Sequence, residues 1–205
     1  SSIRVLRDVE PTQAVASSSS SVSAVELPQP LDASEIVRLN TSGGVAGAPV
    51  GSTRVYGNEV SPITRVYGPG ANQRMADDLT LANGPCDAVY YNLEVYGDGT
   101  VGTFNVHTEL WTGNPCVPGS TVIAGTAADF AGALAVPNNL TRYLLEVPID
   151  PGIPIPGTVW LAVTFSGASA ADATWIIAGQ AEIGSTQNFF SENDTDPVPP
   201  NPDVC

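Results

Sequence analysis

The sequence predicts an all-β protein: an antiparallel β-sandwich of jelly-roll type with an extended N-terminal arm. Three observations predict it. Apolar and polar residues alternate in many short runs, and turn residues separate these runs, with 20 Gly and 18 Pro among 205 residues. No stretch combines helical periodicity with capping residues; the best helical candidate, residues 127–135, is interrupted by Gly132. Many short strands joined by turns are typical of a sandwich.

Residues 1–35 form the predicted arm. It holds a short alternating run, a serine tract and a second apolar run, and it has too little apolar surface to fold alone. Either apolar run could add a strand to the sheet of another copy, or the arm could fold back on its own body. The candidate donor-strand residues are Ile3, Val5, Val9, Val22, Ala24 and Leu27. The sandwich follows at residues 36–192, and a Pro-rich tail, read as a polyproline-like spacer, at 193–205.

The strands of the predicted sandwich begin with a repeated sequence, Thr-Arg-Val-Tyr-Gly, which marks two β-segments with similar roles. The clearest alternation lies in two later runs, residues 89–96 and 103–111, which flank Gly97-Asp98-Gly99. We expect these two runs to form an antiparallel pair with one face in the core. Further strands are expected at residues 53–57, 64–68, 75–81, 121–125, 141–149, 158–165 and 173–180.

The charge distribution excludes several classes of function. All seven basic residues are Arg, and 21 acids leave a net charge of −14, so we expect no nucleic-acid partner and no lysine chemistry. Residues 1–74 carry six Arg and six acids, whereas fifteen acids and Arg142 follow. The neutral, Arg-bearing region of residues 1–74 could dock onto the acidic remainder of another copy, or the charge could simply keep the protein soluble. No apolar run approaches the length of a membrane span, so no membrane insertion is expected.

Three cysteines are typical of an exported protein. Cys86 and Cys116 follow prolines in similar turn sequences at opposite ends of two strand-like runs, and we expect them to form a disulfide. Cys205 is then a free thiol, an intermolecular link, or the true partner of one of the other two.

Catalytic signals are weak, and we expect no enzyme and no cofactor. The one His, His107, shares a strand face with Asn105 and Glu109, which fits either a metal or sugar-hydroxyl site or a solvated side chain. Neither a nucleophile elbow nor a recognisable carboxylate pair occurs. Three acids near turns could bind a structural calcium ion or cap the turns: Asp77, Asp78 and Asp98.

Four aromatic residues are expected on faces that point away from the core, namely Tyr90, Tyr96, Trp111 and Trp160. Outward aromatics stack on sugar rings or form protein interfaces, unless another part of the chain covers them. Glycosylation sequons occur at Asn40, Asn139 and Asn193, and the serine tract suits O-linked sugars at Ser17, Ser18, Ser19, Ser20 and Ser21.

Four strand motifs carry a resemblance to a known family. They are Met75-Ala-Asp-Asp-Leu-Thr-Leu81, Gly102-Thr-Phe-Asn-Val-His-Thr-Glu-Leu-Trp-Thr112, Gly157-Thr-Val-Trp-Leu-Ala-Val-Thr-Phe165 and Trp175-Ile-Ile-Ala-Gly-Gln180. Across residues 50–190 the chain resembles the extracellular β-sandwich domain of bacterial surface and exosortase-sorted (PEP-CTERM-type) proteins. The resemblance implies a secreted, cell-surface sandwich and no reaction. Residues 197–205 contain no Pro-Glu-Pro sorting motif.

Two functional hypotheses follow from the sequence. The first is an extracellular structural protein, a pilus- or fibre-like filament subunit that polymerises head to tail by adding its N-terminal strand to the neighbouring copy. Its partner is a second copy of itself. The alternative is a non-catalytic carbohydrate-binding or adhesive surface module whose partners are glycans.

Overall fold

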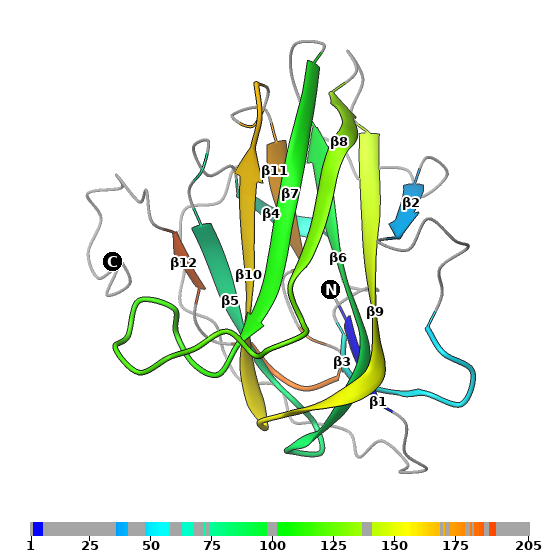
Figure 1. Cartoon of the computed structure of the whole chain (residues 1–205), viewed down its shortest axis with the longest axis vertical. Coiled ribbons are helices and arrows are strands. Elements are labelled where there is room, and N and C mark those ends of the chain that lie inside the picture. The colour runs from blue at the N-terminus through cyan, green and yellow to red at the C-terminus, as the bar shows by residue number, and fades with distance from the viewer. Residues whose placement is uncertain are drawn as a thin grey trace.

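The structure is a computed structural model. It describes residues 2–5, 36–40, 48–57, 63–67, 72, 74–97, 102–136, 141–168, 170, 173–178, 181, 183–186 and 189–191. These residues form twelve strands in two sheets and contain no α-helix. Figure 1 shows the two sheets as two layers. The predicted antiparallel all-β sandwich is confirmed, and the jelly-roll connectivity stays a prediction.

The first sheet, sheet A, has seven strands in the order β2-β9-β6-β1-β3, with β11 beside the far part of β6 and β4 on the other side of β11. β1 and β11 follow one another along the same edge of β6, because β1 pairs with residues 88–92 and β11 with residues 94–97. All pairings in it are antiparallel except β2 with β9. The strands are β1 (Ser2–Val5), β2 (Ile36–Asn40), β3 (Thr53–Gly57), β4 (Ile63–Tyr67), β6 (Cys86–Gly97), β9 (Thr141–Ile155) and β11 (Ala173–Ala178).

The second sheet, sheet B, is antiparallel throughout and has the order β12-β5-β10-β7-β8. Its strands are β5 (Arg74–Thr80), β7 (Gly102–Trp111), β8 (Ala128–Val136), β10 (Thr158–Ser166) and β12 (Phe189–Ser191). In the described part of the chain, no helix is long and apolar enough to cross a membrane.

The core lies between the sheets and is built from every second residue of the central strands. Successive side chains of a strand point to opposite faces, so the alternating apolar residues of β6, β7 and β10 all meet in one layer. At its centre, the ring of Phe104 meets the rings of Phe165 and Tyr143 edge-on, with centroids 5.8 Å and 6.3 Å apart. These contacts join sheet B to sheet A.

The predicted pairing of residues 89–96 with 103–111 is wrong. The first run lies in β6 of sheet A, where β9 is its long neighbour, and the second lies in β7 of sheet B, between β10 and β8. Both runs face the same core, but from opposite sides. Alternation identifies the buried face of a strand and carries no information about its hydrogen-bonding partner.

The best helical candidate in the sequence, residues 127–135, is not a helix: residues 128–136 form the edge strand β8. Pairing with β7 and burial of Phe130 outweigh the weak strand preference of its Ala and Gly residues. Residues 121–125 form no named strand; Val122 makes a single bridge to Trp111. The short strands β2 and β12 had no counterpart among the expected elements.

We expect Phe104→Ala to lower the free energy of unfolding by about 3–5 kcal/mol, because it leaves a cavity where the two sheets meet. Val117→Ala, at an exposed position, is the control and should change it by less than about 0.5 kcal/mol. Urea unfolding of the three proteins measures both effects. Equal midpoints for wild type and Phe104→Ala would show that Phe104 is not at the centre of the core.

Candidate functional site: the β1 slot and the His107 row

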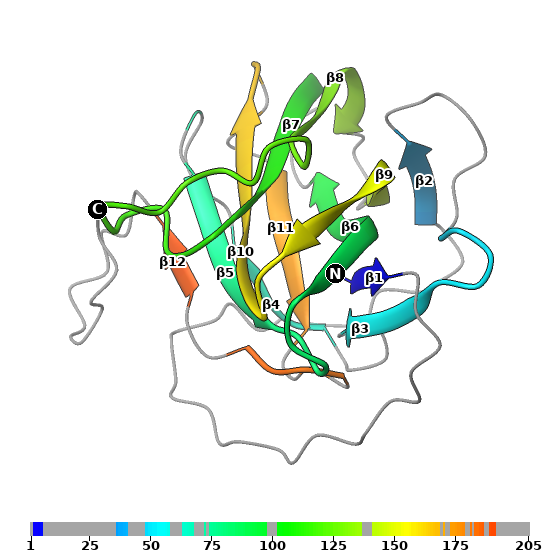
Figure 2. The ribbon, with the colours of Figure 1, turned by 60° about the horizontal axis from the view of Figure 1, so that its bottom comes forward.

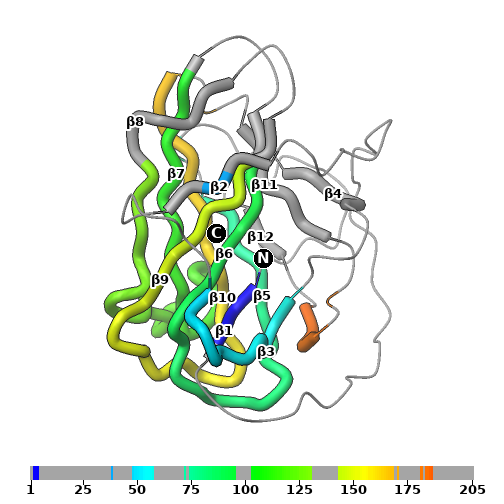
Figure 3. Tube along the Cα trace, turned by 90° about the vertical axis from the view of Figure 1, so that its right-hand side faces the viewer, coloured from blue at the N-terminus to red at the C-terminus, as the bar shows by residue number. Residues whose placement is uncertain are grey.

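The N-terminal strand β1 is an interior strand of sheet A. It is hydrogen-bonded on one side to β3 and on the other to β6, antiparallel to both. Ile3 lies between Tyr56 and Tyr91 in register, and its side chain is 1% exposed within the core. Figure 3 shows β1 between these two strands. We call the site formed by β3 and residues 88–92 of β6 the β1 slot.

No short connection ties β1 to its neighbours. The next strand along the chain, β2, lies at the opposite edge of sheet A, beyond β6 and β9 (Figure 2). Among the described strands, β3 pairs with β1 alone. Outside the strand pairings, Gly57 forms an isolated bridge with Ile183, and the Val55 carbonyl accepts the Ala82 amide at 2.9 Å. Occupation of the slot therefore links β3 to the rest of sheet A.

On the outer face of sheet A, a row of buried polar side chains begins at β1. The Ser2 hydroxyl donates to Asn92 Oδ1 at 3.1 Å, Asn92 Nδ2 donates to the Tyr90 hydroxyl at 3.4 Å, and that hydroxyl donates to Glu146 Oε1 at 2.7 Å. Arg38 Nη1 contacts the same carboxylate oxygen at 3.4 Å. Glu146 is 1% exposed, and its second oxygen has no hydrogen-bond partner among the described residues. Arg38 is 64% exposed. We call the four buried residues, Ser2, Asn92, Tyr90 and Glu146, the Ser2 row.

The structure describes only part of the predicted donor segments. Ile3 and Val5 both lie in β1. Val9, Val22, Ala24 and Leu27 lie outside the described residues, as do Asn139, Asn193 and the serine tract. The sequon at Asn40 is at the end of β2. Alternation at the N-terminus indicated a strand, but nothing in the sequence indicated that its neighbours would be β3 and β6.

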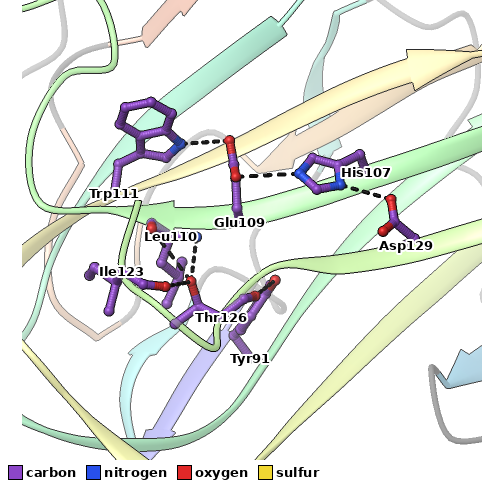
Figure 4. A network of polar contacts seen from close by, with 8 residues as sticks. All are labelled: Tyr91, His107, Glu109, Leu110, Trp111, Ile123, Thr126 and Asp129. Atoms are coloured by element: carbon purple, nitrogen blue, oxygen red, sulfur yellow. Dashed lines mark hydrogen bonds and ion pairs between the residues drawn. The ribbon is translucent and has the colours of Figure 1, made fainter. Parts of the chain in front are cut away.

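A second cluster of polar side chains lies on the outer face of sheet B (Figure 4). His107 is between two carboxylates: Nδ1 is 2.8 Å from Asp129 Oδ1, and Nε2 is 3.3 Å from Glu109 Oε2. The indole N–H of Trp111 donates to Glu109 Oε1 at 2.8 Å, and the guanidinium of Arg74 lies 5.0 Å from the centroid of that indole. Burial acts to lower the pKa of His107, but the two carboxylates outweigh it and the pKa is raised.

Figure 4 also shows how the long connection after β7 returns to the sandwich. The Thr126 hydroxyl donates to the carbonyl of Ile123 at 2.7 Å and accepts the Leu110 amide at 3.1 Å. The buried Tyr91 hydroxyl donates to the carbonyl of Thr126 at 2.7 Å. Because Tyr91 belongs to sheet A and Leu110 to sheet B, Thr126 closes one end of the core between the two sheets.

The expected aromatic surface is not exposed as a sugar platform requires. Tyr90 is 2% exposed and Trp160 is 8% exposed. Trp160 packs with Ala76 and Ala162, and Trp111 and Cys116 pack against this small cluster. Covering by the rest of the chain, one of the sequence alternatives, therefore applies to Tyr90 and Trp160. The side chain of Tyr96 is outside the described part.

Asp77 and Asp78 lie within β5 and not in a turn, and both are buried. The Thr186 hydroxyl reaches both carboxylates, at 2.6 Å from Asp77 Oδ1 and 3.3 Å from Asp78 Oδ1. Burial raises the pKa of Asp77 to about 8, although the Thr186 hydrogen bond opposes the rise. No group of three or more potential metal ligands occurs among the described residues, which do not include Asp98.

The expected disulfide between Cys86 and Cys116 is not formed, because Cys86 is in no disulfide. The two residues belong to different apolar clusters. Cys86 packs against the core between the sheets, whereas Cys116 packs against the Trp160 cluster. Similar turn sequences therefore did not bring them together. Cys205 lies outside the described residues.

Comparisons with protein-family models, with curated proteins and with solved structures found no match to this chain. Its functional interpretation therefore rests on the β1 slot, on the Ser2 row and on the polar cluster around His107.

We expect the stability of the protein to fall between pH 4 and pH 8 because of Asp77. The folded carboxyl keeps its proton up to about pH 8, whereas the unfolded one loses it near 3.8. The contribution of Asp77 to the free energy of unfolding is complete below the unfolded pKa of 3.8, and it is lost as the pH rises to the folded pKa of about 8. Asp77→Asn should therefore flatten the pH dependence of urea unfolding. The control is Asp87→Asn, at an exposed position, and an equal flattening in the control would contradict the assignment.

The imidazole of His107 should titrate above the ordinary value of 6.5, and Asp129→Asn should lower its pKa because it removes one carboxylate. Since His107 is the one His in the sequence, its ring signals in an NMR titration are assigned without ambiguity. Asp87→Asn serves as a charge-matched control. A His107 pKa that is unchanged by Asp129→Asn would show that the pair is not formed in solution.

Proposed function

We propose that this protein is an extracellular structural subunit that polymerises head to tail, with the N-terminal strand of one copy in the β1 slot of the next. The observation that carries the proposal is the position of β1. It is the first strand of the chain, yet it lies inside sheet A between β3 and β6, and no short turn connects it to either strand. The extracellular location of the protein is proposed from the cysteine content and from the resemblance of the strand motifs.

Exchange between copies keeps every contact of the slot. The backbone hydrogen bonds to β3 and β6 and the burial of Ile3 are the same whether β1 belongs to the same chain or to a neighbour. Such strand addition gains its affinity from main-chain hydrogen bonds and its specificity from alternate side chains. Because donor and slot are different surfaces of one subunit, the contact is heterologous and does not close on itself.

The length of the connecting segment permits exchange. Residues 6–35 separate β1 from β2, and a chain of this length spans up to about 100 Å when extended. A folded domain of this size is only roughly 40 Å across. A tether of this length would hold β1 near its own slot at an effective concentration in the mM range. Dilute protein should therefore stay closed, and polymerisation should need high concentration or a transient opening of the slot.

The distribution of charge also supports contact between copies. Arg4, Arg38 and Arg54 lie on β1, β2 and β3, all at partly or fully exposed positions of sheet A. All of the net charge of −14 comes from residues after 74, because residues 1–74 carry six Arg and six acids. Contact of these Arg side chains with the acidic surface of another copy would accelerate and orient head-to-tail encounter.

Export further favours a disulfide. We extend the proposal to a bond between Cys116 and Cys205, one of the pairings that the sequence leaves open for Cys205. Peptide mapping without reduction checks it. A map in which Cys116 and Cys205 both react with a thiol reagent would contradict it.

Polymerisation is tested with Ile3→Asp, which puts a carboxylate at a position that is 1% exposed. The control is Val117→Asp, which puts the same carboxylate at a position that is 54% exposed and outside the β1 slot. Concentrated protein is incubated in mild denaturant, returned to buffer and examined by electron microscopy and size-exclusion chromatography. We expect filaments from wild type and Val117→Asp, and none from Ile3→Asp.

A second variant keeps the test informative if Ile3→Asp does not fold. Arg4 and Arg54 are directly opposite in β1 and β3, so cysteines at both positions can be oxidised in dilute monomer to hold β1 in its own slot. The oxidised protein should remain monomeric, and the reduced protein should polymerise. Filaments from the oxidised protein, or monomers from wild type under all conditions, would refute strand exchange. Monomers would make a carbohydrate-binding module the leading alternative.

A further inference from the structure

The Ser2 row crosses sheet A at one level. Ser2 pairs with Asn92, and Asn92 pairs with Glu146, so β1, β6 and β9 each contribute one residue in register. Tyr90 lies two residues from Asn92 on the same face of β6 and connects it to the carboxylate. Ser2, Asn92, Tyr90 and Glu146 are all buried. A row of this kind contacts the occupant of the slot at one position, that of Ser2.

The hydrogen bonds of the row all run toward Glu146. The Tyr90 hydroxyl donates to Glu146 Oε1, and its oxygen accepts from Asn92 Nδ2. This orients the Asn92 amide with Oδ1 toward β1, where it accepts from the Ser2 hydroxyl. Ser2 supplies this donor with a side chain small enough to be buried.

We infer that the Ser2 row is the specificity-determining element of the β1 slot, which admits an extended strand only with a small hydroxyl residue opposite Asn92. The inference deepens the proposed function, and it rests on that function where the strand comes from a neighbouring copy. Together with the burial of Ile3, it also fixes the register of the strand. A shift by one residue in one direction would put Ile3 opposite Asn92, and a shift by two would put the much longer Arg4 there. A shift by one residue in the other direction would put Ser1 opposite Asn92, and it is opposed by the loss of Ile3 from the core.

This requirement separates the apolar candidates of the arm. The residue before Ile3 is Ser2, and the residue before Val22 is Ser21, so both segments present a hydroxyl. Asp8 precedes Val9 and Glu26 precedes Leu27, and an ionised carboxylate there offers no donor to Asn92. Within residues 6–35, the segment Ser21-Val22-Ser23-Ala24 is therefore the one that competes with β1 for the β1 slot.

The inference is tested in dilute, monomeric full-length protein by amide hydrogen exchange of β1. Ser2→Ala removes the donor without adding volume, and we expect the opening equilibrium of β1 to rise roughly tenfold. Ser2→Asp, which puts a carboxylate opposite the amide oxygen, should raise it more than Ser2→Ala does. Arg4→Ala, on the same strand and half-exposed, is the matched control and should stay within about threefold of wild type.

Coupling to Asn92 distinguishes a specific contact from a general loss of packing. Asn92→Leu replaces the amide by an apolar group of similar shape, and in that background Ser2→Ala should have little further effect. Exchange in Ser2→Ala within twofold of wild type, or additive effects of the two substitutions, would overturn the inference. Since the measurement uses monomers, its result does not depend on whether filaments form.

Cross-linking identifies the occupant. The double variant Arg4→Cys with Arg54→Cys should give a disulfide between the two positions on mild oxidation, and adding Ser2→Asp should lower its yield several-fold. The double variant Ser23→Cys with Arg54→Cys should give little disulfide product on its own and more when Ser2→Asp is added. Predominant linkage through position 23 in wild type would show that the competitor holds the slot, and would overturn the assignment of the row to Ser2.

Discussion

The insertion of β1 between β3 and β6 is the interaction on which the rest of sheet A depends. Four residues supply hydrogen bonds to both neighbours, one buried side chain to the core, and one hydroxyl to a polar row on the outer face. Without them, the edge of β6 at residues 88–92 and the whole of β3 would lack their strand partner in the described sheet. A short segment distant in sequence from both neighbours thus completes the sheet.

The two outer faces of the sandwich use their polar residues differently. On sheet A, the Ser2 row is buried, and its hydrogen bonds run in one direction toward Glu146. On sheet B, His107 is half-exposed between two carboxylates, so its charge is held by neighbours that water also reaches. Buried polar side chains require a partner of matching geometry, whereas exposed charged side chains respond to pH and salt. Of the two polar groups, the Ser2 row of sheet A is therefore the one whose geometry fits the proposed recognition of a strand.

Much of the fold could be predicted from the sequence, because alternation is a local property. The runs in β6, β7 and β10 showed which side chains would be buried, and alternation at the N-terminus indicated the strand that contains Ile3. The partners of those strands could not be predicted. β6 and β7 follow one another and both have an apolar face, but they lie in opposite sheets. The same limit applies to Cys86 and Cys116. Their turn sequences are similar, but Cys86 packs against the core between the sheets and Cys116 against the Trp160 cluster.

By itself the sequence determined the all-β class, the positions of most strands and the absence of lysine chemistry, since each of these depends on composition or on neighbours within a few residues. Only the tertiary structure decided that β1 lies in the middle of a sheet, that Asp77 is buried with a raised pKa, and that Tyr90 donates to Glu146. These features arise from contacts between segments far apart in the chain. Which segments meet is set by the packing of the whole core, and no local pattern records it.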